Sequence, residues 1–191
     1  MAGPSATIRS DRFSFRTPAR LRRIAGVAAL ALATLGQLSI GATPARADVY
    51  DDVAAACARP TIVGTEGSDS LIGTQGPDVI DGLGGNDVID GSGGNDIICG
   101  GDGYDSLYGG AGNDIICGEG SEGDSIFGDA GDDLLLACGN GTSYLSGGEG
   151  NDGLAGLLGN DNLDGGPGAD VCDGGGRDDL AINCEQTANI P

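Results

Sequence analysis

Histidine, lysine and tryptophan are all missing from the 191 residues of this sequence. The absence of histidine excludes Ser-His-Asp and Cys-His catalysis, H-E-x-x-H metalloprotease chemistry and imidazole-bound zinc. The nine basic residues are all arginines, and only Arg59 and Arg177 lie beyond residue 47. Nucleic-acid binding and attraction to anionic membrane surfaces both need a basic footprint, so both are excluded for residues 48–191.

Aromatic residues are also few, and glycine takes their place. Glycine makes up 35 of the 144 residues from 48 to 191, and each glycine loses much conformational freedom on folding. A thick globular core is therefore not expected. The aromatic residues beyond residue 47 are Tyr50, Tyr104, Tyr108, Phe127 and Tyr144.

Residues 1–47 have the pattern of a secretory signal peptide. Six arginines lie between Arg9 and Arg23, an apolar run covers residues 24–40, and Ala45-Arg46-Ala47 offers a cleavage point. A membrane anchor is the alternative, but the run is shorter than the roughly 20 residues that a span needs. We therefore predict export, an extracellular location and no membrane attachment after cleavage.

Residues 48–191 carry two arginines against 28 acidic residues, a net charge of −26. A chain with this charge repels itself and resists collapse unless cations neutralise it.

The rest of the chain is a tandem repeat of about nine residues. It divides into thirteen units that begin at residues 64, 73, 82, 91, 100, 109, 118, 128, 137, 147, 156, 165 and 174. Within a unit, positions 1 to 6 are a glycine-rich turn that usually ends in Asp, and positions 7 to 9 are a minimal strand. Units 118–127 and 137–146 each hold one extra residue before the strand.

The middle residue of each predicted strand is apolar and is expected to point inward. This register holds across both insertions, and such short strands must stack to bury a narrow core. The inward series is Leu71, Ile80, Ile89, Ile98, Leu107, Ile116, Ile126, Leu135, Leu145, Leu154, Leu163, Cys172 and Ala181.

Lines such as GSGGNDIIC and GGAGNDIIC resemble the calcium-binding nonapeptide repeats of RTX (hemolysin-type) proteins, G-G-x-G-x-D-x-U-x, where U is a large aliphatic residue. The resemblance implies an all-β fold, a parallel β-roll or right-handed β-solenoid, with two units per coil and Ca²⁺ held between successive turns. The resemblance covers the roll (64–181), and the whole chain then divides into a signal peptide (1–47), an N-terminal lead-in or cap (48–63), the roll and a C-terminal cap and tail (182–191).

The Asp at position 6 is the predicted calcium ligand. Ca²⁺ takes six to eight oxygen ligands, and glycine turns offer backbone carbonyls beside the carboxylates. With two units per coil the Asp residues form two ladders with a spacing of about 4.8 Å. The odd-unit ladder is Asp69, Asp87, Asp105, Asp124, Asp161 and Asp179, and the even-unit ladder is Asp78, Asp96, Asp114, Asp133, Asp152 and Asp170.

Unit 137–146 has Ser143 where Asp is expected. We predict that the odd-unit calcium sites fail or weaken around residues 120–146, while the even ladder stays continuous. Asp also serves as a turn former, but turn chemistry alone would let Asn and Ser interchange with it, and Asp occupies position 6 in all the other units.

Six cysteines lie beyond residue 47, which suggests disulfides in an exported chain. In the β-roll Cys99 and Cys117 are neighbours on adjacent strands, and a Cys172–Cys184 bridge would fold the cap over the core. If Cys99 and Cys117 pair, Cys57 and Cys138 remain too far apart to meet. The alternative pairs Cys57 with Cys99 and Cys117 with Cys138, and the sequence does not choose.

The outward positions of the even units are mostly apolar. They could be ordinary strand residues, a partner or dimer surface, or a face covered by residues 48–60, whose pattern is weakly helical. Position 7 of these units holds Val79, Ile97, Ile115, Leu134, Gly153 and Val171, and the apolar stripe is extended by Cys99, Cys117 and Leu136.

Together these patterns predict a secreted calcium-binding repeat protein that folds on binding Ca²⁺ and acts as a structural, adhesive or interaction module. Calcium ions are its predicted partners, with a protein partner or self-association through the even-unit face. No enzymatic activity is expected. The alternative is a calcium-dependent extracellular hydrolase or lyase that acts on polysaccharide.

Overall fold

The structure is a computed structural model that describes residues 48–176 and 178–190. The signal peptide predicted for residues 1–47 lies outside the described residues. Within them, no helix is both long enough and apolar enough to span a membrane.

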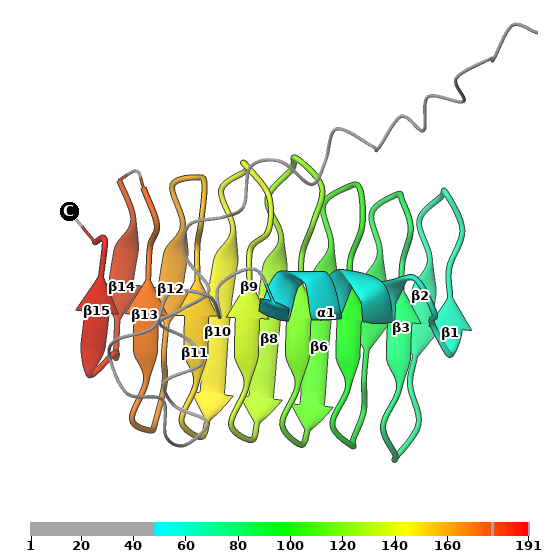
Figure 1. Cartoon of the computed structure of the whole chain (residues 1–191), viewed down its shortest axis with the longest axis horizontal. Coiled ribbons are helices and arrows are strands. Elements are labelled where there is room, and N and C mark those ends of the chain that lie inside the picture. Colours follow the sequence, from blue (N-terminus) through cyan, green and yellow to red (C-terminus); the bar gives the residue numbers. More distant parts are fainter. Residues whose placement is uncertain (1–47, 177, 191) are drawn as a thin grey trace, which may run out of the picture.

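The chain winds into a flattened solenoid of about seven coils whose two walls are parallel sheets (Figure 1). The six strands from even units form an eight-stranded sheet together with one strand before the first unit and one after the last, and the strands from odd units form a seven-stranded sheet. This confirms the predicted all-β parallel roll with two units per coil. The eight-stranded sheet contains β1 (Ile62–Val63), β3 (Val79–Asp81), β5 (Ile97–Cys99), β7 (Ile115–Cys117), β9 (Leu134–Leu136), β11 (Gly153–Ala155), β13 (Val171–Asp173) and β15 (Gln186–Ala188). The seven-stranded sheet contains β2 (Ser70–Ile72), β4 (Val88–Asp90), β6 (Ser106–Ala111), β8 (Ser125–Ala130), β10 (Tyr144–Glu149), β12 (Asn162–Asp164) and β14 (Leu180–Ile182).

The core is one column of side chains from the middle of each strand, as the repeat frame predicts. Both insertions preserve it, because Leu107 pairs with Ile126 and Ile126 with Leu145. Ile62, Leu71 and Ala181 pack against the column at its ends. The buried members are Ile80, Ile89, Ile98, Leu107, Ile116, Ile126, Leu135, Leu145, Leu154, Leu163 and Cys172, together with Ala137, which stands at position 1 of its unit and outside the strands.

Three strands of the seven-stranded sheet are longer than the repeat predicts. β6, β8 and β10 each have six residues. Their pairing continues beyond position 9 into the next turn, where Gly110 pairs with Asp129 and Asp129 with Gly148. Stacked turns of equal shape hydrogen-bond to each other in the same way as the strands that precede them.

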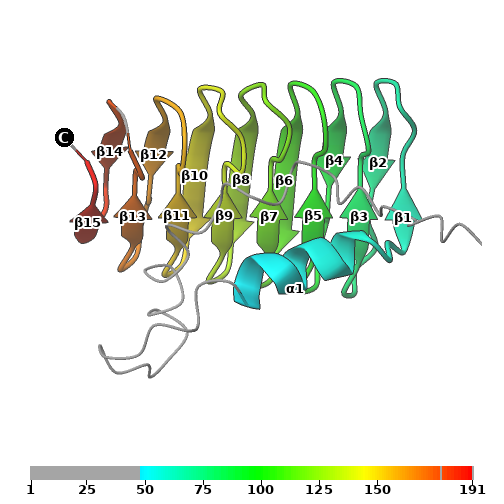
Figure 2. The same cartoon turned by 45° about the horizontal axis from the view of Figure 1, so that its top comes forward.

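Residues 48–57 form α1 (Asp48–Cys57), which packs against the outer face of β3 and β5 (Figure 2). The helix predicted from residues 48–60 therefore covers part of the apolar even-unit face and does not close the end of the roll. Farther along this face, Leu134, Leu136, Ala155 and Leu157 form a second buried cluster.

The cysteines pair as Cys57–Cys99, Cys117–Cys138 and Cys172–Cys184. The Cys172–Cys184 prediction is confirmed, but a Cys99–Cys117 bridge is not present although the two residues are in register. Side chains on neighbouring strands stand roughly parallel to each other, perpendicular to the sheet, and do not converge as a disulfide requires. α1 brings Cys57 to Cys99, and the turn after β9 brings Cys138 to Cys117.

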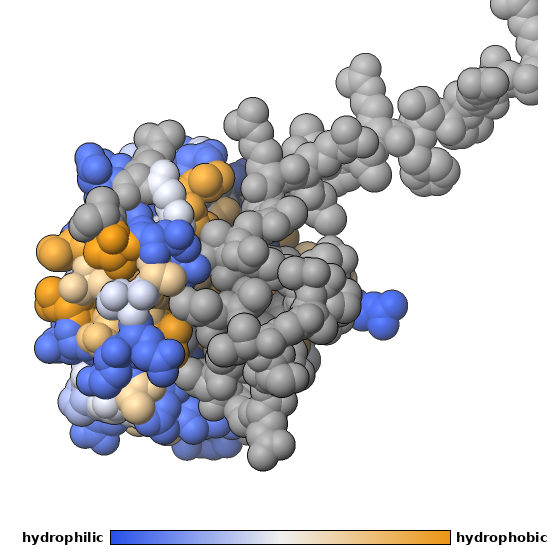
Figure 3. Space-filling model, turned by 60° about the vertical axis from the view of Figure 1, so that its left-hand side comes forward, coloured by the Kyte–Doolittle hydropathy of each residue, from blue (hydrophilic) through white to orange (hydrophobic). Residues whose placement is uncertain are grey.

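The two ends of the roll leave apolar side chains at the surface. Val63 and Ile72 are 56% and 67% exposed at the N-terminal end, and Leu180 and Ile182 are 56% and 48% exposed at the other. The view onto the C-terminal end shows hydrophobic residues directly beside hydrophilic ones (Figure 3).

Candidate metal sites

The twelve predicted Asp residues all lie on two ladders, one in each row of turns. Asp87 shows the arrangement, since its Oδ1 accepts a hydrogen bond from the backbone N–H of Asp69 at 2.8 Å, and its own N–H donates to Oδ1 of Asp105 at 2.9 Å. On the even side Asp96 links Asp78 and Asp114 in the same way, with both bonds at 2.8 Å. Each carboxylate is therefore fixed by the coil before it.

The second oxygen of most of these carboxylates has no partner. Oδ2 is buried and without a hydrogen bond in Asp87, Asp96, Asp105, Asp114, Asp124, Asp133, Asp152, Asp161, Asp170 and Asp179. A buried polar atom left unpaired costs about 1–3 kcal/mol, and more when the group is charged. Ten such atoms, repeated along two ladders, therefore indicate that these turns are built to hold a positively charged group.

The glycine at position 1 lines the space beside each of these oxygens. A Cβ on Gly100 would lie 2.6 Å from Oδ2 of Asp105 and 2.6 Å from the carbonyl oxygen of Gly118 in the next coil. A Cβ on Gly91 would meet Asp96 and the Gly109 carbonyl at the same distances. Only glycine lets a carboxylate oxygen and a carbonyl oxygen of the next coil approach this closely.

This donor set fits a hard cation that prefers oxygen. Ca²⁺ accepts carboxylate and backbone carbonyl oxygens together, with flexible geometry. Within the described ranges, no three acidic, His or Cys side chains converge on one point. A cation between two rungs would therefore need carbonyl oxygens such as those of Gly100 and Gly118, in addition to the carboxylates.

Burial sets the electrostatics of the ladder interior. It raises the pKa of Asp124 and Asp133 to about 7, against the lowering effect of one backbone N–H each, and the carboxylate one coil earlier raises these values further. Burial likewise raises the pKa of Asp114, Asp152 and Asp161 to about 6. Without a cation, the folded roll holds these carboxylates in an environment that disfavours their charge.

The first coil differs from the others. Thr65 donates its backbone N–H and its hydroxyl to Oδ2 of Asp69, at 2.6 and 2.8 Å. Thr74 makes the same two bonds to Oδ2 of Asp78, at 2.7 and 2.8 Å. The Thr74 N–H lowers the pKa of Asp78, whereas burial raises that of Asp96 one coil later.

The backbone at position 2 separates the two kinds of coil. In every unit from residue 82 onward this residue has a positive φ, for example Leu83 and Ser92 at 71°. Thr65 and Thr74 do not, as expected for β-branched residues. In the left-handed conformation the N–H turns away from the Asp of its own unit, and Leu83 instead donates to Oδ1 of Asp81 at 3.0 Å.

Ser143 occupies its rung of the odd ladder without a carboxylate. Its Oγ accepts the N–H of Asp124 at 3.2 Å, and its own N–H donates to Oδ1 of Asp161 at 2.8 Å. The hydrogen-bonded ladder is thus continuous while its negative charge is interrupted. The predicted loss of odd-unit calcium sites here stays a prediction.

Sequence reasoning did not find Glu185. Its Oε2 accepts the N–H of Asp170 at 2.7 Å, which is the bond that the next Asp would make on the even ladder. The residue lies fifteen positions after Asp170 and outside the nonapeptide frame, so periodicity could not reveal it. The only signal was an acidic residue directly after the last cysteine.

Comparison with known proteins bears on the identity of the repeats. No curated protein sequence and no solved structure matches the chain. The family model of the RTX calcium-binding nonapeptide repeat matches in four copies, at residues 63–98, 94–123, 120–137 and 146–181. The copies leave out residues 138–145, which contain Ser143, and together they cover more than half of the chain. The chain therefore belongs to the RTX calcium-binding nonapeptide-repeat family.

Proposed function

We propose that this chain is an exported calcium-binding protein whose roll folds when Ca²⁺ binds, and that it serves as a structural, adhesive or interaction module. The repeat roll of the family is a structural calcium-binding module. Three disulfides are typical of an oxidising compartment, which supports export.

The observation that carries the proposal is the row of ten buried Oδ2 atoms without a partner. The residues that would hold Ca²⁺ are the ladder carboxylates and the position-1 carbonyls of adjacent coils. Bound calcium would supply the positive charge that these oxygens lack. All twelve predicted Asp residues remain candidate ligands, and the geometry favours the ten with a free oxygen over Asp69 and Asp78.

The chain's own charge explains why folding would depend on the ion. Residues 48–191 carry a net charge of −26, and folding stacks carboxylates along two ladders while burying them. An ion that binds only the folded state stabilises it in proportion to the logarithm of its concentration. Extracellular calcium modules have Kd values of about 10⁻⁴–10⁻³ M, so a calcium-poor cytoplasm would leave the chain unfolded.

Circular dichroism during calcium titration tests the proposal. We expect the β signal to be low in calcium-free buffer and to rise cooperatively with Ca²⁺. Mg²⁺ is the matched control, because it demands a rigid octahedral shell and keeps its waters, and it should give a much weaker response. A full β signal without calcium, in the chain with its disulfides reduced, would contradict calcium-driven folding.

Solution measurements separate the possible roles of the module. Analytical ultracentrifugation with and without calcium would show whether the folded roll self-associates. Calcium-dependent oligomers would favour an adhesive or interaction role, and a monomer in both conditions would favour a calcium-buffering or matrix role.

A further inference from the structure

The C-terminal segment after β14 rebuilds one more rung of the even ladder. β15 pairs with β13 in the repeat register, with Thr187 opposite Cys172. Glu185 accepts the N–H of Asp170 as each ladder Asp accepts the N–H of the rung before it. The turn from Asp170 to Glu185 spans 15 residues, whereas Asp152 and Asp170 are separated by 18. The shortening lies before β15, because the Gln186 N–H still donates to the Asp170 carbonyl as the Val171 N–H donates to the Asp152 carbonyl. Glu185 therefore stands in the register of a ladder Asp.

A backbone carbonyl also takes the place of the position-1 glycine carbonyl. A Cβ on Gly147 would collide with Oδ2 of Asp152 and the Gly165 carbonyl, and a Cβ on Gly165 would collide with Oδ2 of Asp170 and the Asn183 carbonyl. Asn183 has a φ of 52°, the left-handed conformation that Asn tolerates. Its carbonyl oxygen lies beside Gly165 as the Gly165 carbonyl lies beside Gly147, although the position-1 glycines of the repeats do not share this positive φ.

One oxygen of Asp170, the ladder residue before Glu185, lacks a hydrogen-bond partner. Asp170 is fully buried, and its Oδ2 has no hydrogen-bond partner. The Asn183 carbonyl lies on the same side of Gly165 as this Oδ2 atom, and the Glu185 carboxylate is bonded to the N–H of the same Asp170. A buried carboxylate oxygen without a donor points to a positive ligand at this place.

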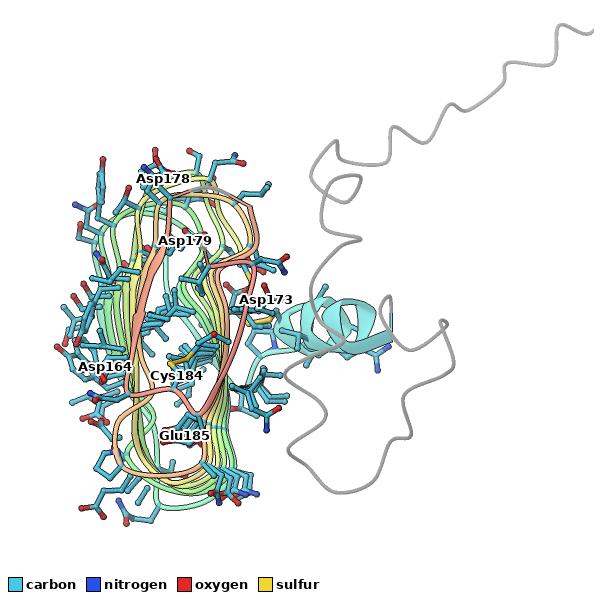
Figure 4. The ribbon with its side chains drawn as sticks, turned by 90° about the vertical axis from the view of Figure 1, so that its left-hand side faces the viewer. Asp164, Asp173, Asp178, Asp179, Cys184 and Glu185 are labelled. Carbon is cyan, nitrogen blue, oxygen red and sulfur yellow. A yellow bond between two sulfur atoms is a disulfide. The ribbon has the colours of Figure 1, made fainter. Side chains whose placement is uncertain are left out.

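The odd ladder ends in another way. Beside Gly174 and Oδ2 of Asp179 lies the Cδ1 atom of Ile190 in place of a carbonyl from a further coil. In the view along the axis, Glu185 and Asp179 lie toward opposite ends of the flattened cross-section (Figure 4). An apolar side chain thus closes the odd side, while oxygen ligands continue the even side.

We propose that Asp170, Glu185 and the carbonyl of Asn183 form a terminal calcium site that closes the even ladder. The inference rests on the proposed function and adds a site outside the nonapeptide repeats. The Cys172–Cys184 disulfide and a 2.8 Å bond from Nδ2 of Asn183 to Oδ1 of Asp164 hold the shortened turn in place. The site therefore needs no further coil.

Equilibrium dialysis of the full chain with radiolabelled Ca²⁺ tests this site. Glu185→Gln keeps an oxygen that accepts the Asp170 N–H but removes the charge, so it should bind one calcium ion fewer than wild type at saturation. Glu185→Asp should keep the ion, because residue 185 lies in the register of the ladder Asp residues and the charge is retained. The matched control is Glu66→Gln at the other end of the roll, which should bind as many ions as wild type.

Two outcomes would overturn the inference. The first is an unchanged number of bound ions in Glu185→Gln. The second is an equal loss in Gln186→Ala, since Gln186 is an exposed residue of β15 beside Glu185 that has no role in the site, and the loss would then report damage to the cap. Failure of the wild-type chain to bind calcium would instead refute the proposed function.

Discussion

The first coil and the coils after it share one repeat frame with Asp at position 6, but they differ in whether the second carboxylate oxygen of that Asp has a hydrogen-bond partner. In the first coil, Thr65 and Thr74 satisfy Oδ2 of Asp69 and Asp78. From Asp87 onward the equivalent oxygen is buried and unpartnered. The difference teaches that position 6 supplies the carboxylate, while position 2 decides whether its second oxygen is available to a cation.

The largest expected difference between the two kinds of coil is the effect on calcium binding of removing one carboxylate charge. Asp105→Asn should lower calcium affinity at its two neighbouring sites by about tenfold or more, which is about 1.4 kcal/mol or more, because Asn keeps the acceptor for the Asp87 N–H and loses the charge. Asp69→Asn should leave affinity and the number of bound ions unchanged. Calcium titration calorimetry measures both, and equal effects in the two variants would abolish the distinction between the coils.

The interrupted rung offers a gain of function. Ser143→Asp restores the missing carboxylate between Asp124 and Asp161 and should add at least one bound calcium ion on the odd side. In calcium-free buffer the same variant should keep less residual β signal than wild type, because three carboxylates then stack without a cation. Ser143→Asn, which adds similar bulk without charge, is the control. A Ser143→Asp chain with wild-type calcium stoichiometry would show that this part of the roll lacks other ligands.

Position 2 can be exchanged directly. Thr74→Gly removes the hydroxyl that binds Asp78 and permits a positive φ, so we expect one additional, weak calcium ion on the even ladder. Thr74→Ser keeps the hydroxyl and serves as the control. Equilibrium dialysis at saturating calcium counts the bound ions. An unchanged number in Thr74→Gly would mean that binding is prevented because this coil lies at the end of the roll, and not by its threonine.

The smallest expected effect concerns pH. Burial raises the pKa of Asp124 and Asp133 to about 7, so the metal-free folded roll binds protons more tightly than the unfolded chain. Their contribution to stability is complete below the ordinary pKa of 3.8 and is lost as pH rises through about 7. The β signal in calcium-free buffer should therefore increase as the pH falls from about 8 to about 5. A β signal that falls over this range would contradict the electrostatics of the ladder.

Asp78 should act with the opposite sign. The Thr74 N–H lowers its pKa, so its contribution is present above the ordinary pKa and is lost as pH falls through the lowered value. The effect lies at a more acidic pH than that of Asp124. The Thr74→Gly variant should lose it, and this provides an internal control for the pH experiment.

The repeat frame could be derived almost completely from the sequence because it is local and periodic. A glycine turn, an aspartate and an inward aliphatic residue recur in each unit, so a single unit defines the coil and its neighbours repeat it. This is why the register held through the insertions before Ile126 and Leu145. Calcium chemistry followed from the same lines, since carboxylates beside glycine carbonyls suit few other ions.

Contacts that break the period were decided only by the tertiary structure. The partner of Cys99 depends on where α1 lies, and that helix is outside the repeat. Glu185 reaches the even ladder only because β15 docks beside β13 after a shortened turn. Thr65 and Thr74 look like ordinary turn residues in sequence, and their bonds to Asp69 and Asp78 depend on the conformation of the backbone at one position. Periodic sequence thus determines the stack, and the packing of non-repeating segments determines how the stack begins, how it is linked and how it ends.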